Sequence, residues 1–439
     1  MLKYLKIFTN KWLFRFRTWL LIMMLMRCGF VFIYHNYGIG LGPGTLDYED
    51  YYITAENVVN GKGFISPENN LDSRAFLGDN YYFSSEPGYV LFLLMFLPNK
   101  VDHLLITLVS NSLLYILIMW LIWKSFALLG LDKKFSVIAM ILLLVNPHII
   151  HYSLRGSPEL LRMAVILTMF YYFLSIVRTG LNLPQIVLLG ILGGFSILVR
   201  ITFIMIPFFL LPLIVKYSNK KLISAIIYIS SILIVLMPWV YRNYHDFGMI
   251  TIDYRLTHSH LEVNNIPEQV DLRKYKIAFG TWRITDNGKW IKLRTETNAD
   301  RLNEMLSTID DKPVQWLKMY GLIGWELFKP FPQGGKLIRI MQSTILSSFD
   351  PVISKLILQT YSFIVNIPWL LGFTLFSSGT IKDLKPLWFW FSIGFFSFIC
   401  AHLLSNNPHS RYMLPLLPVG YIAFFTFVDR NLKSKIKVG

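Results

Sequence analysis

The chain has 439 residues and a formal net charge of +16, yet only 15% of its residues are charged and 54% are hydrophobic. A soluble domain carries about 25% charged residues, so this composition excludes an ordinary soluble protein. The basic residues lie in short runs between apolar segments and not on one accessible face, which argues against nucleic acid and predicts the lipid bilayer as a partner.

Apolar runs follow one another along the chain and predict an all-α polytopic membrane protein. A bilayer core of roughly 30 Å needs about 20 mostly apolar residues per helix. The ten predicted spans are 14–35, 103–126, 134–153, 158–177, 185–200, 201–217, 222–241, 356–377, 385–404 and 411–428. Basic residues recur in alternate connections, so the positive-inside rule predicts that both termini lie in the cytoplasm.

This topology divides the chain into three parts. Residues 1–241 would form a membrane core with the first seven helices and a first external loop at 36–102. Residues 242–355 would form an external cap, mainly helical, and residues 356–439 the last three helices and a basic cytoplasmic tail. Within the first loop we expect short amphipathic helices, one of them in the run 87–98, which is too brief to span a bilayer.

The segment DYEDYYITAENVVNGKGF (47–64) predicts the other short helix of this loop. Apolar and aromatic residues recur at helical spacing, Asp47 stands at a candidate N-cap, and Gly61 stands at a C′-like position. Asp47 is then either a simple helix cap or a carboxylate held at the boundary between water and lipid. Spacing alone leaves both interpretations open.

Six segments in chain order carry a resemblance to a known family. After 47–64 they are EPGYVLFL (86–93), NPHIIHYSLRGSPELL (146–161), GILGGFSILVRITF (190–203), PWVYRNYHDFG (238–248) and SRYMLPLLP (410–418). Each lies at a predicted outer helix end. Together they resemble the membrane-integral GT-C glycosyltransferases, in the branch related to protein O-mannosyltransferases and aminoarabinose lipid A transferases. Val90 replaces the usual second proline of one motif, and Pro158 interrupts the Ser-Glu pair of another.

The resemblance implies the ten-helix GT-C fold and a transfer reaction. A sugar would move from a polyprenyl-phosphate carrier to an external glycan, lipid or protein acceptor, with inversion at the anomeric carbon. An attacking hydroxyl must lose a proton, so a carboxylate is needed as general base, and the resemblance implies Asp47 in this role. Asp50, one turn along, is the alternative, and Glu159 would position the acceptor or share the role. The alternative for Glu159 is an exposed acid favoured by a helix N-terminus.

The leaving lipid phosphate needs cationic groups, and guanidinium suits phosphate because its fork of donors matches the oxygens. The candidates are Arg200, Arg411, Arg242 and the weaker Arg155. The alternative for each is a side chain that merely reaches water at a helix end, and Arg242 could instead lock the loop to the bundle.

Further substrate contacts are expected from Tyr51, Asn57 and Tyr89, although aromatic residues also gather at membrane interfaces for general reasons. Arg27, inside the first span, predicts a partner in the bundle, for which a carboxylate of the first loop is a candidate. We expect no metal site and no required cofactor, while a divalent cation bridging Asp47 and the lipid phosphate stays open.

Two other classes remain as alternatives: an O-antigen ligase or polymerase, and a transporter of polysaccharide or lipid-linked sugar. A ligase would place its Arg and His residues in the large external loop, and a transporter would show a repeat or charges along a path. The residue usage favours a bacterial plasma membrane. The sugar and the acceptor are not specified by the sequence.

Overall fold

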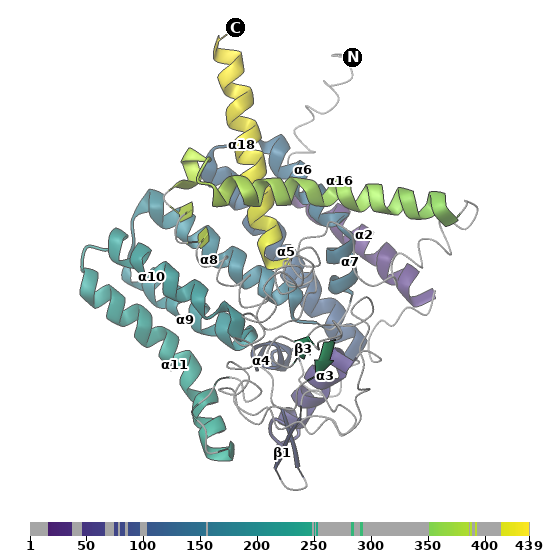
Figure 1. The fold of residues 1–439 in the computed structure, drawn as a ribbon, viewed down its shortest axis with the longest axis vertical. Helices are drawn as coiled ribbons and strands as arrows, with labels where there is room; N and C mark the ends of the chain where they lie inside the picture. The colour runs from purple at the N-terminus through teal and green to yellow at the C-terminus, as the bar shows by residue number, and fades with distance from the viewer. Residues whose placement is uncertain are drawn as a thin grey trace.

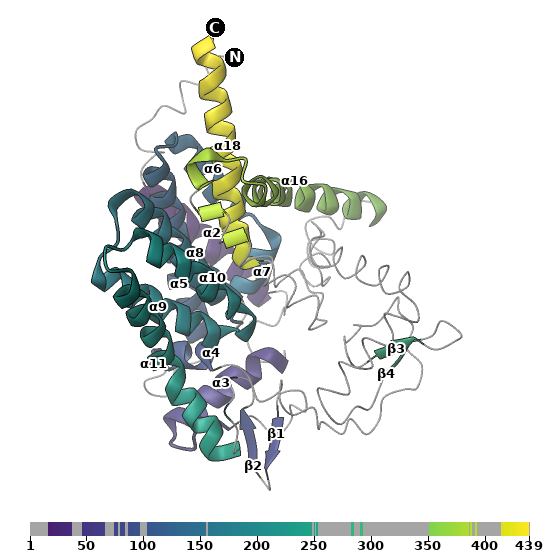
Figure 2. The same ribbon diagram turned by 60° about the vertical axis from the view of Figure 1, so that its left-hand side comes forward.

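The computed structural model describes residues 16–36, 46–65, 74–77, 80–83, 87–96, 103–154, 157–247, 250, 252, 282–284, 290–292, 351–385, 387–388, 391–392 and 414–438. Long helices form a bundle (Figure 1). At one end lie the short helices α3 (Leu46–Val59) and α4 (Gly88–Leu94), and from the other end projects the C-terminal part of α18 (Leu417–Val438). Figure 2 shows the same separation from a second direction.

The remaining helices of the bundle are α2 (Phe16–Asn36), α5 (His103–Leu129), α6 (Lys133–Leu144), α7 (Pro147–Ser153), α8 (Glu159–Thr179), α9 (Leu183–Val199), α10 (Met205–Tyr217), α11 (Lys221–Phe247) and α16 (Pro351–Ser377). Among the described residues there are also two 3-10 turns, η2 (Ile201–Phe203) and η3 (Lys382–Leu384). Within the described residues, Leu105–Leu129, Glu159–Thr179 and Lys221–His245 are long and apolar enough to cross a membrane. The chain is therefore a membrane protein, as its composition predicts. The predicted span 385–404 lies mostly outside the described residues.

Helix α9 packs closely on α11 because its glycines leave no side chain between them. A Cβ on Gly190 would lie 2.7 Å from the carbonyl oxygen of Tyr228, and one on Gly194 would lie 2.8 Å from that of Ile232. Small residues at a membrane-helix interface allow this backbone approach. The opposite face of α11 is exposed, and this is the face that lipid would cover.

The predicted span 134–153 is not one continuous helix, because the structure divides it into α6 and α7. Pro147 has no backbone N–H to donate, and its ring disfavours a helical conformation at Asn146. The buried side chain of Asn146 makes up for part of the lost hydrogen bonding. Its amide nitrogen donates to Asn366 Oδ1 on α16 over 3.1 Å, and its Oδ1 accepts from the backbone N–H of Ile149 over 3.4 Å.

Helix α16 runs across α18 and not alongside it (Figures 1 and 2). The crossing point is made by two glycines, since a Cβ on Gly372 would meet the carbonyl oxygen of Gly420, and a Cβ on Gly420 would meet that of Trp369. The Tyr421 hydroxyl adds a hydrogen bond of 2.9 Å to the carbonyl oxygen of Val365. The predicted span 356–377 is thus part of a helix that lies crosswise to its neighbour.

Two short β-hairpins depart from the predicted all-helical architecture. Strands β1 (Arg74–Leu77) and β2 (Asn80–Phe83) pair antiparallel in the first loop, with Leu77 opposite Asn80. Strands β3 (Trp282–Ile284) and β4 (Trp290–Lys292) pair antiparallel in the 242–355 segment. Most of that segment lies outside the described residues, so its predicted helical cap stays a prediction.

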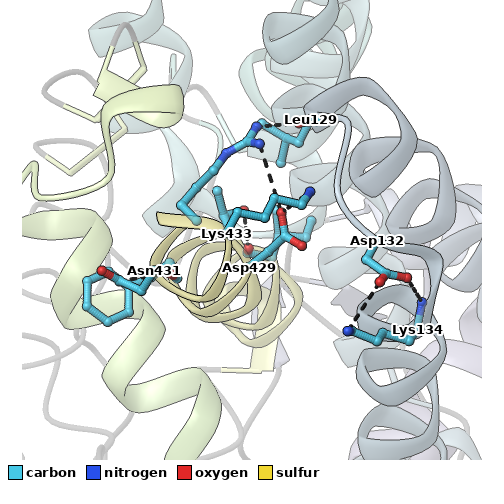
Figure 3. A network of polar contacts seen from close by, with 10 residues as sticks. Leu129, Asp132, Lys134, Asp429, Asn431 and Lys433 are labelled. Atoms are coloured by element: carbon cyan, nitrogen blue, oxygen red, sulfur yellow. Dashed lines mark hydrogen bonds and ion pairs between the residues drawn. The ribbon is translucent and has the colours of Figure 1, made fainter. Parts of the chain in front are cut away.

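A cluster of charged side chains joins α18 to α5 at the end of the bundle away from α3 (Figure 3). The buried carboxylate of Asp429 accepts from Lys433 Nζ over 2.6 Å, and Arg430 Nη1 lies 3.9 Å from it. Arg430 Nη2 donates to the carbonyl oxygen of Leu129, the last residue of α5, over 2.7 Å. A cation suits this position because the last carbonyls of a helix lack partners within the helix.

Candidate functional site

Helix α3, which carries the acid-rich start of the first loop, is fixed to the start of α5. The hydroxyl groups of Tyr52 and Thr107 form a hydrogen bond of 2.7 Å, and both residues are fully buried. The helix ends as predicted, because Gly61 has φ +74° and the N–H of Lys62 donates to the carbonyl oxygen of Asn57 over 2.8 Å. The middle of α3 is therefore held on α5, and a local turn ends the helix.

Asn57, predicted to contact substrate, lies partly buried near the end of α3. Its amide nitrogen donates to the carbonyl oxygen of Ile65 over 2.8 Å and closes the loop that contains the two glycines. Gly63 in this loop also has a positive φ of 79°. In the structure, the side chain of Asn57 therefore stabilises the loop that follows α3.

Helix α4 joins α3 to the end of α9. Tyr89 is buried, with the ring of Tyr51 from α3 packed edge-on against it at a centroid distance of 5.2 Å. On the other side, a Cβ on Gly88 would lie 2.6 Å from the backbone nitrogen of Val199. The Pro-Gly-Tyr segment of the first loop therefore touches the backbone that immediately precedes Arg200.

Arg200 stands where α9 ends and η2 begins. Its φ of −161° and ψ of 120° are extended, so the helix stops at Val199, and its N–H donates to the carbonyl oxygen of Ser196 over 3.0 Å. The side chain is partly exposed. The predicted division of the chain between the spans 185–200 and 201–217 is confirmed at this residue. The side chain of Arg200 therefore extends from a backbone turn, and the residue before it is in contact with α4.

Arg242 lies near the C-terminal end of α11 and reaches the first loop. Its guanidinium carbon is 4.7 Å from the ring centroid of Trp239, a cation–π geometry, and Nη2 donates to the carbonyl oxygen of Phe64 over 3.4 Å. Phe64 itself packs edge-on against Trp239 at 5.0 Å. The indole N–H of Trp239 donates to the carbonyl oxygen of Ile252 over 2.8 Å. One turn of α11 thus holds both the part of the first loop that follows α3 and the start of the 242–355 segment.

Glu159 begins α8 and is 2% exposed, so the alternative of an exposed acid at a helix start is wrong. Its Oε1 lies 3.5 Å from Nη1 of Arg162, which is also buried. The two residues are one helical turn apart, so the pair forms within the first turn of α8. A buried carboxylate needs such a cation, because an isolated charge in this position would be costly.

Several predicted site residues fall outside the described part of the chain. They are Arg155, Arg411 and the side chains of Asp47 and Asp50. The backbone of both acids belongs to α3, which begins at Leu46, so Asp47 lies within the first turn and not before it. The first turn of a helix favours negative charge because of its free N–H groups.

Three described residues that position this region were not predicted as such. Thr107 holds α3 on α5, Gly88 lets α4 approach α9, and Trp239 on α11 packs against Phe64 in the loop that follows α3. Gly88 lay within a recognised motif, whereas Thr107 is a single small polar residue in a long apolar run and gave no signal of its partner. Together these contacts gather an acidic helix, two arginine-bearing helix ends and several aromatic rings at one end of the bundle.

Comparisons with known proteins give a structural match only. No protein-family model matches the chain, and no curated protein matches its sequence. The structure is similar to the crystal structure of the oligosaccharyltransferase of Archaeoglobus fulgidus in its apo form, with a TM-score of 0.54 and 12% sequence identity. The match covers 98% of this chain and 52% of the other, so this chain spans about half the length of that enzyme. Likeness at this identity shows the fold, which is in line with the GT-C fold expected from the motifs.

Proposed function

We propose that the protein is an integral membrane glycosyltransferase of the GT-C class. It moves a sugar from a polyprenyl-phosphate carrier to a hydroxyl or amine of a glycan, lipid or protein on the external face. The observation that carries this proposal is the docking of α4, which packs on α3, against the end of α9, because it brings the acid-rich loop toward Arg200. The similarity in fold to an oligosaccharyltransferase supports the same class of reaction.

In the proposed reaction, a carboxylate oxygen of Asp47 accepts the proton of the acceptor group. The acceptor atom forms a bond to the anomeric carbon as the bond from that carbon to the phosphate oxygen breaks on the opposite face. The configuration inverts, and the polyprenyl phosphate leaves with the bonding electron pair. A general base of this kind contributes typically about 10²- to 10⁴-fold to the rate.

Arg200 has the role of neutralising the charge that develops on the leaving phosphate. Fixed donors aimed at developing charge are effective because they need no reorganisation during the reaction. Arg411 and Arg155 remain candidates for the same role. For Arg242, the contacts with Trp239 and Phe64 favour the loop-locking alternative over direct phosphate binding. Tyr51 and Tyr89 would face the sugar only in part, since they also pack on one another.

Glu159 has the proposed role of positioning the acceptor from the start of α8. Its Oε1 accepts a hydrogen bond from Nη1 of Arg162 over 3.5 Å, so this ion pair holds the carboxyl group in place at the start of α8. A divalent cation near Asp47 is compatible with the acidic residues of α3, and the proposed proton transfer does not depend on one. The proposed location is a bacterial plasma membrane with both termini in the cytoplasm.

The test is sugar transfer by purified membranes that contain the wild-type chain or Asp47→Asn. Labelled polyprenyl-phosphate sugars are offered as a panel, with total cell-envelope extract as acceptor. We expect one donor to be consumed by the wild type and the rate to fall by about 10² or more in Asp47→Asn. Glu49→Gln, in the same turn of α3, is the matched control and should retain activity.

Equal rates for Asp47→Asn and wild type would remove Asp47 from catalysis. Consumption of no phosphate-linked donor, with transfer from a pyrophosphate-linked donor instead, would favour the ligase alternative. Movement of a lipid-linked sugar across the membrane without transfer would favour the transporter.

A further inference from the structure

Arg27 is a buried cation in α2 whose partners are backbone carbonyl groups. It is 8% exposed, and its Nη2 donates to the carbonyl oxygen of Ser153 over 2.8 Å and to that of Leu108 over 3.3 Å. Among the described residues, no carboxylate lies within ion-pair distance of it, and its Nε has no hydrogen-bond partner. Of the carboxylates of the first loop, only Glu56 has a side chain among the described residues, so the expected partner from that loop stays a prediction.

The two carbonyl groups lie at the end of the bundle that carries the candidate site. Counted from the charged cluster at Leu129, α5 rises about 30 Å to Leu108, at roughly 1.5 Å per residue. This is the thickness of a bilayer core, so Leu108 lies about one bilayer core away from the charged cluster.

Burying Arg27 in this way is costly for stability. Two of the hydrogen bonds in this region are made to the same group, the carbonyl of Ser153. A buried cation whose Nε has no hydrogen-bond partner among the described residues is destabilising compared with a packed apolar side chain. The carbonyl of Ser153, the last residue of α7, also accepts from Asn111 Nδ2 over 3.0 Å. A carbonyl oxygen has two lone pairs, so Arg27 on α2 and Asn111 on α5 together use both.

The chain that follows this fixed carbonyl leads directly to Glu159. Only a short connection separates Ser153 from the start of α8, where Glu159 and Ser157 are both buried. The same turn of α5 holds α3, because Thr107, the partner of Tyr52, is the residue before Leu108. One turn of α5 is therefore the common support of α3 and of the connection that precedes Glu159.

We infer that Arg27 is a positioning residue. By fixing the end of α7 on α5, it keeps Glu159 in a constant position relative to the first loop, which is held on the same turn of α5. The inference rests on the proposed function for its catalytic consequence. Arg27 acts through the backbone of Ser153 and does not contact the substrate. Loss of Arg27 should therefore leave substrate binding largely intact and lower the rate of the bound complex.

The first arm of the test follows the connection itself and needs no substrate. In a full-length chain with Cys28→Ser and Cys400→Ser, Ser157→Cys is labelled with a maleimide. Ser125→Cys serves as the control, because Ser125 is equally hidden and neither serine hydroxyl has a hydrogen-bond partner among the described residues. Arg27→Met should speed labelling at position 157 by about tenfold, through local opening, and leave position 125 unchanged.

The second arm measures the proposed sugar transfer in the same membranes. Arg27→Met should lower kcat by about 10- to 100-fold with little change in KM, because a small misplacement of a positioning group is enough for such a loss. Arg27→Lys should restore part of kcat, since its ammonium group can donate to the same carbonyls. Arg178→Met, at an exposed arginine in the last turn of α8, is the matched control and should change neither arm.

Unchanged labelling at position 157 would overturn the inference, and so would equal acceleration at positions 157 and 125, which would mean a general loosening. Faster labelling at 157 with unchanged kcat would overturn the catalytic consequence. If Arg27→Met does not accumulate, Arg27→Gln takes its place with the same expectations. If the wild type itself transfers no sugar, the proposed function fails, and the labelling arm still decides whether Arg27 fixes the end of α7.

Discussion

Gly88 and Val199 are in direct backbone contact, so that a Cβ on Gly88 would lie 2.6 Å from the nitrogen of Val199 and 2.7 Å from the carbonyl carbon of Leu198. Neither atom belongs to a flexible side chain, so neither can move aside cheaply. This contact joins the first loop to the helix end that carries Arg200. It is the shortest described route between the two parts of the candidate site.

Gly88→Ala should therefore separate α4 from α9 and reduce sugar transfer by about tenfold or more, while the protein still inserts and folds. The measurement is transfer rate at matched protein level. Gly29→Ala is the control, because nothing lies within 4 Å of a Cβ there and alanine favours a helix over glycine. Full activity of Gly88→Ala would contradict the close approach.

The Tyr52–Thr107 hydrogen bond should be measurable as a coupled pair. Tyr52→Phe and Thr107→Val each leave one buried hydroxyl without its partner, and each should destabilise the protein by about 1–3 kcal/mol. The double variant should cost less than the sum, because no unmatched hydroxyl remains. The measurement is the free energy of unfolding of each variant in detergent. If the losses of the two single variants simply add in the double variant, the two hydroxyl groups do not interact.

The crossing of α16 and α18 should be intolerant of any side chain. Gly372→Ala and Gly420→Ala each place a Cβ against a backbone carbonyl and should lower the thermal midpoint by several degrees. Substitutions at Gly130 or Gly180 measure backbone strain alone, because both glycines have positive φ and a Cβ there would meet nothing within 4 Å. Asn is tolerated at positive φ, so Gly130→Asn should be far milder than either crossing variant.

The contacts among Arg242, Trp239 and Phe64 should protect the part of the first loop that follows α3. Trp239→Leu removes both the ring beneath the guanidinium and the hydrogen bond to Ile252, so the loop around Gly61 and Gly63 should become more accessible to a protease. Limited proteolysis followed by mass spectrometry locates the cut. Trp123→Leu, at a tryptophan on α5, is the control, and equal cleavage in both variants would argue against a local clamp.

Protein stability should depend on pH through Asp132, which lies at the end of the bundle away from α3. Partial burial alone would raise the pKa of its carboxyl, but hydrogen bonds from the backbone and ammonium groups of Lys134 outweigh it, so the pKa lies below the usual value. The carboxylate therefore contributes stability above the unfolded-state pKa of about 4, and this is lost as the pH falls through the lower folded value.

Asp132→Ala should cost about 1 kcal/mol at neutral pH through loss of the helix cap, and Asp132→Asn only part of that. The difference between wild type and Asp132→Asn should shrink below about pH 4, where the wild-type carboxyl takes up a proton. Thermal unfolding at a series of pH values measures this. A difference that stays constant down to pH 2 would contradict the lowered pKa.

Much of the helical layout follows from the sequence, because a bilayer demands long apolar runs. The end of α9 at Arg200 and the glycine end of α3 were predicted correctly for the same local reasons that the structure shows. The β1–β2 hairpin was missed, although Gly-Asp between two short runs rich in aromatic residues is a recognised hairpin signal. The break before Pro147 was ambiguous, since membrane helices often tolerate proline.

The site was less predictable than the fold, because the arrangement of its side chains depends on contacts between segments that are far apart in the sequence. The burial of Glu159 had one local signal, an arginine three residues on, at the spacing of a helical ion pair. No local pattern specifies that Arg27 reaches Ser153, or that Trp239 meets Phe64. Such pairs depend on how the helices assemble.

A proline within a membrane helix usually gives the chain a place to bend, and the break between α6 and α7 looks suited to be a hinge. Both ends of α7 are nevertheless tied, at Asn146 to α16 and at Ser153 to α2 and α5. Bending at the break would have to disrupt buried hydrogen bonds to three other helices. We therefore expect this joint to be stiff, so that any motion that admits a long lipid takes place elsewhere in the molecule.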